Sequence, residues 1–315
     1  MAELTLEEFE NYDVTKLRYD ELRELILNFH DAHPDAKKWN LNKWNISHMA
    51  NMHGLFRRCT TLEELIIDKW DTRNVTDMSE MFEWCALLKV LKQNFNTENV
   101  TDMSGMFHDC RSLPELDLSN FSTKNVTDMC GMFDWCESLE ELDLSNFSTK
   151  NVKDMRWMFE GCQSLTCLNI SSFNTERVVR VHAMFILCES LKELDLSSFN
   201  MRGVKDMSRM FSGCRSLERI TLPKFYDRVV DIDDMFYNCE KLTHLDLSDI
   251  GFYADDHGCY YLDNFHNCDS LADLKFPQLP RDARFLLSTA VKLKSLSISP
   301  LNIKDSRPSR DIYTP

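Results

Sequence analysis

The sequence is organised by a cysteine that recurs at nearly constant intervals. Nine cysteines follow one another at spacings of 26, 25, 26, 26, 26, 26, 25 and 29 residues, namely Cys59, Cys85, Cys110, Cys136, Cys162, Cys188, Cys214, Cys239 and Cys268. A phenylalanine stands three residues before each of them. A period between ~20 and 50 residues is typical of solenoids, in which each repeat packs only against its neighbours. The 315 residues are therefore predicted to form one elongated array.

Each repeat reads as two structural pieces, following the pattern M-x-x-M-F-x-x-C-x-x-L-x-x-L-D-L-S-x-F. Met103, Met106, Phe107 and Cys110 stand at i, i+3, i+4 and i+7, which predicts one face of a short helix. The L-x-x-L-x-L that follows predicts a short strand with inward leucines. We therefore expect an α/β solenoid of the leucine-rich-repeat type, a right-handed coil with a parallel β-sheet on one face and short helices on the other.

The repeat also predicts the domain boundaries. Residues 1–42 lack it, but contain a capping-box pattern at Thr5 to Glu8 and an amphipathic stretch, which together predict a helical N-terminal cap. Residues 43–300 are expected to form nine units and a degenerate tenth, in which Ala290 replaces the cysteine. Residues 301–315 are expected to be a flexible tail. A three-residue insertion within 251–259 predicts a surface loop of unassigned role.

The in-register cysteines are expected to be buried, free and inert. Neighbouring helices lie ~8 to 10 Å apart, and this exceeds the ~7 Å Cα separation that a disulfide tolerates. His257 with Cys259, and His266 with Cys268, are residue types that bind zinc. Because Cys268 belongs to the core repeat, we predict neither a metal site nor a cofactor.

The repeat resembles a known family. Residues 99–121, 125–147 and 151–173 all follow the motif N-V-x-D-M-x-x-M-F-x-x-C-x-S-L-x-x-L-x-x-S-x-F. This motif is similar to the BspA-like leucine-rich repeats of the mycoplasma-lipoprotein type, and the resemblance covers roughly residues 43–300. It implies a curved parallel-sheet solenoid used for protein recognition or adhesion. It names no ligand, because function resides in the exposed residues.

The outward positions of the predicted strands supply a candidate partner-binding surface. They place seven carboxylates on the strand face, namely Glu115, Asp117, Glu141, Asp143, Glu193, Asp195 and Asp246. Adjacent strands lie ~4.8 Å apart, and like charges that close together are unfavourable without a counter-charge. One interpretation is that this acidic concave face receives a basic protein segment. The other is that these residues are solvated and idle.

A second candidate interface lies on the opposite, convex face. Trp135, Trp157, Ile186 and Leu187 occupy positions that should flank the core or point away from it in three successive repeats. Exposed apolar clusters commonly mark interfaces, so self-association into a homo-oligomer is one hypothesis. Packing beneath a long connection is the alternative.

Charge and missing motifs restrict the function further. Lys+Arg 36 against Asp+Glu 51 gives a net charge of −15, which disfavours nucleic acid, because Lys and Arg supply most of that affinity. No apolar run reaches the ~18 residues of a membrane span, and the acidic N-terminus lacks a signal-peptide pattern. We expect a cytoplasmic protein, with virion association or non-classical export left open. No P-loop, G-x-S-x-G or H-E-x-x-H occurs, so a non-enzymatic binding module is predicted.

Overall fold

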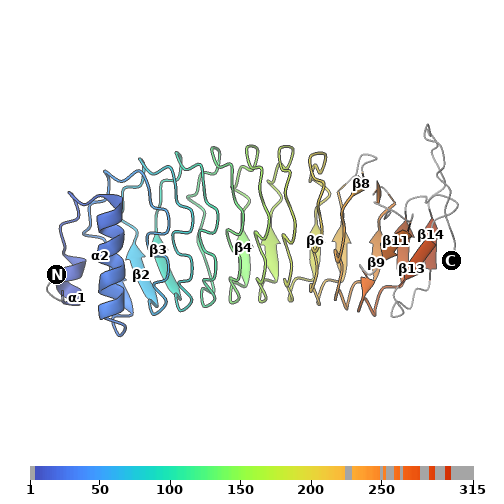
Figure 1. The fold of residues 1–315 in the computed structure, drawn as a ribbon, viewed down its shortest axis with the longest axis horizontal. Coiled ribbons are helices and arrows are strands. Elements are labelled where there is room, and N and C mark those ends of the chain that lie inside the picture. Colours follow the sequence, from blue (N-terminus) through green and yellow to red (C-terminus); the bar gives the residue numbers. More distant parts are fainter. Residues whose placement is uncertain are drawn as a thin grey trace.

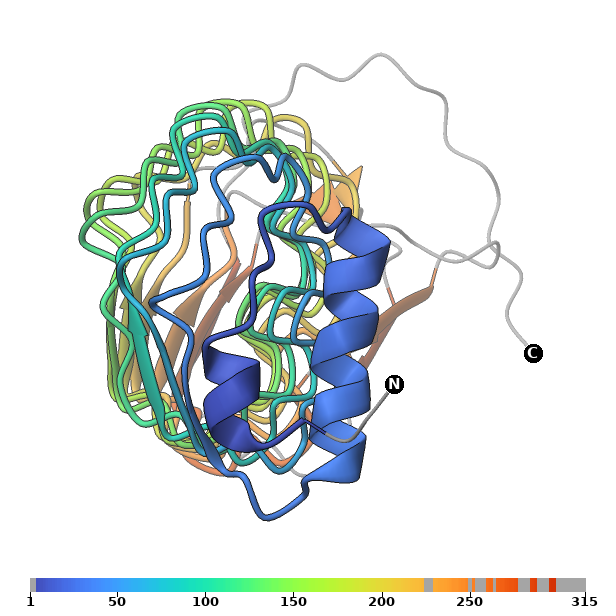
Figure 2. The same cartoon turned by 90° about the vertical axis from the view of Figure 1, so that its left-hand side faces the viewer.

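The chain forms an elongated stack of coils that is covered at its N-terminal end by two helices (Figures 1 and 2). The computed structural model describes residues 4–223, 229–248, 251–252, 259–262, 265–276, 284–287 and 295–298. Each coil is one repeat, and successive coils lie side by side along the long axis of the molecule (Figure 1). The predicted parallel solenoid with a helical N-terminal cap is confirmed.

Two helices and a series of short strands make up the described regular structure. The helices are α1 (Leu6–Glu10) and α2 (Tyr19–Ala32). The strands are β1 (Lys38–Asn40), β2 (Glu64–Ile67), β3 (Val90–Gln93), β4 (Glu141–Asp143), β5 (Cys167–Asn169), β6 (Glu193–Asp195), β7 (Arg219–Thr221), β8 (Val229–Val230), β9 (His244–Asp246), β10 (Gly251–Phe252), β11 (Cys259–Leu262), β12 (Asp273–Phe276), β13 (Arg284–Leu287) and β14 (Ser295–Ile298).

The strands of successive coils pair in parallel, and residues of equal repeat position oppose each other. The main strand face consists of the groups β1-β2-β3, β4-β5, β6-β7 and β9-β12-β14. Smaller parallel pairs join β8 to β10 and β11 to β13. Strand β1 lies inside the range predicted for the cap, yet it pairs with β2. The strand ladder therefore begins before the predicted boundary at residue 43.

In the repeats that the structure describes, the expected α-helices do not form, and this part of the prediction is wrong. Both described helices belong to the N-terminal cap. In the repeats, the M-x-x-M-F-x-x-C stretch is a series of tight turns, which we call the turn segment. Its backbone amides alternate between two acceptors: Met106 N donates to Met103 O in its own coil (3.3 Å), whereas Phe107 N donates to Met132 O in the next (2.9 Å).

Left-handed backbone makes these turns possible. Two residues four positions apart have positive φ in most turn segments, for example Gly105 (58°) with Asp109 (61°) and Gly131 (59°) with Trp135 (55°). Glycine adopts this conformation at little cost, whereas a residue with a Cβ is disfavoured there. The turn segment still directs both methionines, the phenylalanine and the cysteine inward, so burial of the predicted core residues is confirmed.

The interior is a set of stacked side chains that runs through the whole array. The phenylalanine of each turn segment lies parallel to that of the next coil, as in Phe107 and Phe133, whose ring centroids are 5.8 Å apart with an interplanar angle of 6°. All nine in-register cysteines are buried and unpaired. Buried threonines at another corner bond from coil to coil, as when Thr123 Oγ1 donates to Ser148 O (3.1 Å). Apolar burial and coil-to-coil hydrogen bonds therefore act along the same axis.

The N-terminal cap replaces the neighbour that the first coil lacks. Phe9 of α1 stacks on Phe29 of α2, with ring centroids 3.9 Å apart, and meets Trp39 and Trp44 edge-on. Helix α2 lies against the first turn segment, where the Tyr19 hydroxyl donates to His53 O and Arg23 Nε donates to Gly54 O (3.1 Å). In later coils the equivalent carbonyl accepts from the preceding coil, as Ser79 O does from Gly54 N (2.8 Å). The cap thus buries the apolar surface of the first coil and supplies a hydrogen-bond donor for its backbone carbonyl.

Several predicted features fall wholly or partly outside the described residues. These are the tail 301–315, most of the 251–259 insertion, His257, and Ala290 of the predicted tenth unit. Within the described residues, no helix has the length and apolar character needed to cross a bilayer.

Candidate functional site

The strand face presents two outward columns, each with one residue per coil. The first column runs Lys38, Glu64, Val90, Glu115, Glu141, Cys167, Glu193, Arg219, His244 and Asp273. The second runs Asn40, Ile66, Lys92, Asp117, Asp143, Asn169, Asp195, Thr221, Asp246 and Lys275. All seven carboxylates proposed from the sequence lie in these columns and are exposed.

The aspartates of the second column have a local structural role. Asp117, Asp143, Asp195 and Asp246 each accept a hydrogen bond from the backbone amide two residues later, as between Asp143 Oδ1 and Ser145 N (2.9 Å). This bond stabilises the turn that follows the strand. Bonds to the serine amide lower the pKa of Asp117, Asp143 and Asp195. The L-D-L-S pattern therefore has a structural explanation, although all four aspartates remain exposed.

The glutamates of the first column differ in whether a cation accompanies them. Glu64 pairs with Lys38 (2.9 Å), and Glu193 pairs with Arg219 of the next coil. In the second column, Asp246 pairs with Lys275 (3.0 Å). Sequence reasoning missed these pairs, although Arg219 and Lys275 occupy equal repeat positions one coil further on. Glu193 and Asp246 are consequently weaker candidates than the sequence indicated.

Four of the seven carboxylates lie together and form no ion pair among the described residues. Glu115, Asp117, Glu141 and Asp143 lie on two successive coils, and no ion pair reaches them in the part of the chain that the structure describes. We call these four residues the central acidic patch. In the preceding coil, Val90 (39% exposed) borders Glu115, and Lys92 precedes Asp117 in the second column without forming an ion pair among the described residues. Exposed carboxylates lack the burial that tunes an acid against a base, but they can attract ammonium or guanidinium groups.

The convex candidates lie on the turn segments at three different repeat positions, and all four are half-buried. Trp135 and Leu187 occupy the second left-handed position of their turn segments, and Trp157 occupies the first. Arg111 lies over the Trp135 ring (5.6 Å to the centroid), and Arg156 over the Trp157 ring (4.9 Å). Part of the expected apolar surface is therefore covered by arginine side chains.

Trp135 and Leu187 also pack on the coil that follows each of them. A Cβ built on Gly161 would lie 2.9 Å from Trp135 Cδ2, and one on Gly213 would lie 2.6 Å from Leu187 Cδ2. A bulky residue in one coil is therefore matched by a glycine in the next. This contact explains the half-burial of both side chains, and the sequence signal for it was a glycine at the same repeat position one unit later.

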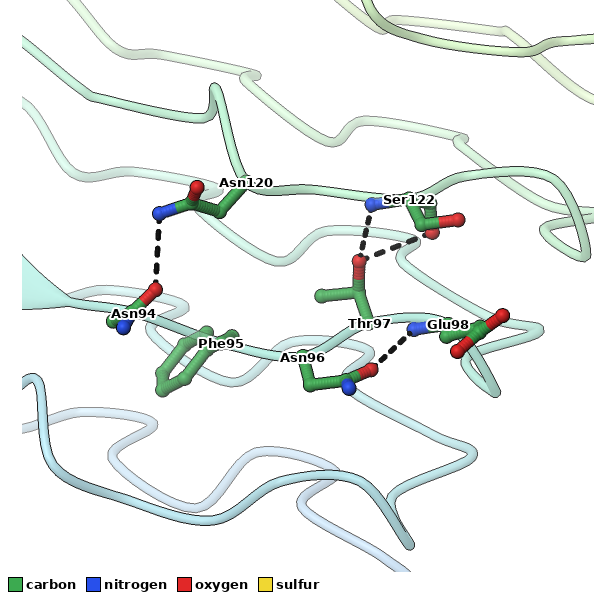
Figure 3. A pocket seen from close by; sticks show the side chains of 7 residues that line it. All are labelled: Asn94, Phe95, Asn96, Thr97, Glu98, Asn120 and Ser122. Carbon is green, nitrogen blue, oxygen red and sulfur yellow. Dashed lines mark hydrogen bonds between the residues drawn. The ribbon is translucent and has the colours of Figure 1, made fainter.

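A shallow depression of about 450 Å³ lies beside a shortened repeat. The interval after Cys85 is 25 residues, and the depression is lined by Asn94, Phe95, Asn96, Thr97, Glu98, Asn120 and Ser122 (Figure 3). Asn120 Nδ2 donates to Asn94 Oδ1 (2.9 Å), and Ser122 N donates to Thr97 Oγ1 (2.7 Å). Since many of its polar groups already bond one another, the depression offers few groups for a ligand.

One group of potential metal ligands lies on the turn-segment side. Donor atoms of Asp128, Cys130 and Asp154 lie within 4.8 Å of one another. However, Asp154 is only 4% exposed and is already engaged by Arg156 (2.8 Å) and Arg180 (3.3 Å). Burial also raises the pKa of the Cys130 thiol to about 12, and thiols bind metals as thiolates. The arginine side chains already balance the charge of Asp154, and the neutral thiol of Cys130 is a poor metal ligand, so this group is not a strong candidate metal site.

A protein-family model matches most of this chain. The profile described as "Mycoplasma protein of unknown function, DUF285" matches residues 24–141, 87–167 and 129–249. These overlapping matches span the cap helix α2 and most of the described coils. A search of curated protein sequences finds no match for this chain.

Comparison with solved structures gives several weak similarities. An internalin of Listeria monocytogenes is 17% identical with a TM-score of 0.33, over 90% of this chain and 76% of the other. A leucine-rich repeat protein of Bacteroides ovatus is 15% identical with a TM-score of 0.27, over 78% and 77%. TLR13, solved in complex with the RNA ssRNA13, is 17% identical with a TM-score of 0.38, over 89% of this chain and 42% of the TLR13 chain. This chain thus spans less than half of TLR13.

Proposed function

Since this chain belongs to the DUF285 family of Mycoplasma proteins of unknown function, we propose that it is a non-enzymatic protein-binding module whose central acidic patch receives a basic segment of a protein partner. The observation that carries the proposal is the absence of an ion pair at Glu115 and Glu141 among the described residues, whereas Glu64 and Glu193 on the same column are paired. The BspA-like subtype and a cytoplasmic location remain predictions from the sequence.

Electrostatics support a protein partner of this kind. A net charge of −15 repels phosphate groups but accelerates the approach of basic proteins. Backbone bonds between β4 and β5 fix the positions of Glu141 and Asp143. Glu115 and Asp117 occupy the equivalent positions of the preceding coil, in a segment that is not part of a described strand. Four acidic groups spaced at ~4.8 Å between coils repel one another, and a basic side chain relieves that repulsion.

The test is a charge reversal in the patch with a matched reversal elsewhere. We expect Glu115→Lys plus Glu141→Lys to weaken binding of a synthetic lysine- and arginine-rich peptide by about tenfold or more, since each lost pair of close charges costs on the order of 1 kcal/mol. Titration calorimetry at increasing NaCl measures this loss and its dependence on salt. Screening should weaken wild-type binding steadily.

The control is Glu24→Lys plus Glu176→Lys, which changes the net charge equally at two exposed sites away from the patch. This variant should keep most of the wild-type affinity. Equal losses in the two variants would show that the peptide senses only the overall charge, and would remove the patch as the binding site.

A second candidate function is self-association through the convex residues Trp135, Trp157, Ile186 and Leu187. The observation that favours it is that all four apolar side chains stay partly exposed on successive coils, and exposed apolar clusters commonly mark interfaces. Under this alternative, Trp157→Glu lowers the hydrodynamic mass of a multimer, as measured by sedimentation. An unchanged mass would remove it.

A further inference from the structure

A row of ionisable side chains crosses the turn segments of five successive coils. Each member directly follows the buried phenylalanine of its coil, and the members are Arg57, Glu83, His108, Asp134 and Glu160. Water has little access to these ionisable groups, because the side chains of Glu83, Asp134 and His108 are only 8%, 15% and 30% exposed. Ile186 occupies the next position and ends the row.

The N-terminal half of this row is matched in charge. Arg57 forms ion pairs with Glu83 and with Glu80, the latter at 2.7 Å. The imidazole of His108 then lies between two carboxylates, with Nδ1 3.4 Å from Glu83 Oε1 and Nε2 3.4 Å from Asp134 Oδ2. Within this half, every carboxylate has a basic group beside it.

The C-terminal half of the row is not matched. Glu160 follows Asp134 in the next coil, and no ion pair reaches Glu160 in the described residues. Asp134 Oδ1 is buried without a hydrogen-bond partner. The other oxygen, Oδ2, faces the His108 imidazole at 3.4 Å, but burial lowers the pKa of His108 and so favours the neutral ring. A hydrogen bond from the Trp135 amide is the remaining contact that favours the ionised form of Asp134. A buried carboxylate that no full positive charge offsets is costly when ionised, whereas the protonated form removes the charge. Two neighbouring carboxylates strengthen this preference, because like charges disfavour double ionisation.

We propose that the Asp134 and Glu160 pair retains a proton in the folded protein at neutral pH, and that release of this proton destabilises the central coils as the pH rises. The row thereby acts as a pH-sensitive element in the coils that also carry the central acidic patch. The patch lies on the opposite side of these coils, so the proton does not take part in the proposed binding contact.

The other charged groups around Asp134 do not supply a positive charge that would replace the retained proton. In the preceding coil, Asp109 adds negative charge, and Arg111 pairs with Asp109 (2.7 Å) and with Glu137 (3.1 Å). The thiols of Cys130, Cys136 and Cys162 are nearby, and burial raises the pKa of all three, so they stay neutral. In the following coil the charged neighbour is Glu160.

The directions of the pKa shifts of Asp134 and Glu160 agree with their burial. Burial, followed by the charge of Glu160, raises the pKa of Asp134 from 3.8 to about 8, and burial also raises the pKa of Glu160. A group whose pKa is raised in the folded state stabilises that state at low pH, and this stabilisation is lost as the pH climbs through the folded value. Burial lowers the pKa of His108, so its contribution has the opposite sign and is lost as the pH falls below its ordinary value of 6.5.

Urea unfolding of the whole chain between about pH 5 and pH 9 tests the proposal. For each retained proton, the unfolding equilibrium constant should rise by up to about tenfold per pH unit until the folded pKa is passed. Asp134→Asn should flatten this dependence and raise the urea midpoint at pH 8, because an amide carries no charge. The exposed Glu115→Gln serves as the control and should keep the wild-type dependence.

A measurement on the wild-type protein guards against a variant that does not fold. Infrared spectroscopy of the folded chain at pH 7 should detect the stretch of a protonated carboxyl group, which disappears as the pH approaches 9. The proposal is overturned if wild-type stability is flat over this range, if Asp134→Asn keeps the wild-type slope, or if no protonated carboxyl is seen. None of these results depends on partner binding.

Discussion

At the scale of single residues, the in-register cysteines show why a thiol suits this position. Each described one after Cys59 donates its thiol hydrogen to the carbonyl of a phenylalanine in the preceding coil, as Cys136 Sγ does to Phe107 O (3.2 Å). The side chain is small and apolar, but it also satisfies a backbone acceptor. Burial raises the pKa of these thiols, which keeps them unreactive.

Labelling with a thiol reagent at neutral pH should therefore separate the described cysteines. Cys167 is exposed on β5 and should react within minutes. Cys136 should react only after unfolding, because a buried thiol becomes accessible to the reagent only when the core opens. Peptide mapping by mass spectrometry identifies the labelled site, and Cys167→Ser should remove its label. Rapid labelling of Cys136 in the native protein would contradict the described core.

At the scale of the element, the turn segment replaces the helix that the apolar spacing indicated. Side chains at positions i, i+3, i+4 and i+7 point inward in a helix and also in the turn segment, so their spacing cannot distinguish the two conformations. Amides that donate to the next coil, such as Asp109 N to Asp134 O (2.7 Å), are unavailable to a helix. A two-turn helix is marginal by itself. The glycines at the left-handed positions were the available signal.

Two glycine substitutions separate the cost of this backbone from the cost of crowding. Gly131 and Gly161 both have positive φ, but a Cβ on Gly131 first meets an atom at 3.7 Å, whereas one on Gly161 meets Trp135 at 2.9 Å. Gly131→Ala should cost about 1 to 2 kcal/mol of unfolding free energy, and Gly161→Ala about 1 to 3 kcal/mol more. Urea unfolding measures both. Equal losses would mean that Trp135 does not pack on Gly161.

At the scale of the whole molecule, the fold depends on its covered end. Every internal coil is buried on two sides, but the first coil would expose Trp39, Leu41 and Trp44, which are 1%, 0% and 3% exposed in the folded chain. The cap helices cover this surface, and the Tyr19 hydroxyl donates to the carbonyl of His53, which has no preceding coil to bond to. Terminal units of repeat proteins need such covering for solubility.

Removing residues 1–36 should accordingly expose an apolar end and cause association. Size-exclusion chromatography with light scattering should show a larger mass than for the full chain, together with a lower melting temperature. A shorter deletion of residues 1–4, which leaves α1 intact, is the control and should remain like the full chain. A monomeric deletion of 1–36 with unchanged stability would show that the cap is dispensable.

The strand face shows how far sequence reasoning reached at the candidate site. The repeat placed all seven carboxylates outward, and all seven are exposed. It did not reveal that Glu193 and Asp246 have cations in the next coil, nor that the aspartates serve the turn after the strand. Those contacts depend on which side chain of a neighbouring coil turns toward the carboxylate, and a single repeat does not contain that information.

The repeated pattern alone determined the period, the inward residues and the solenoid architecture, because every coil must bury the same apolar positions against identical neighbours. Only the tertiary structure decided the backbone of the turn segment, the pairing of surface charges and the buried position of Asp134. The physical reason is that these features arise between coils: an amide or a carboxylate responds to the group one period away in sequence, which stacking brings within bonding distance.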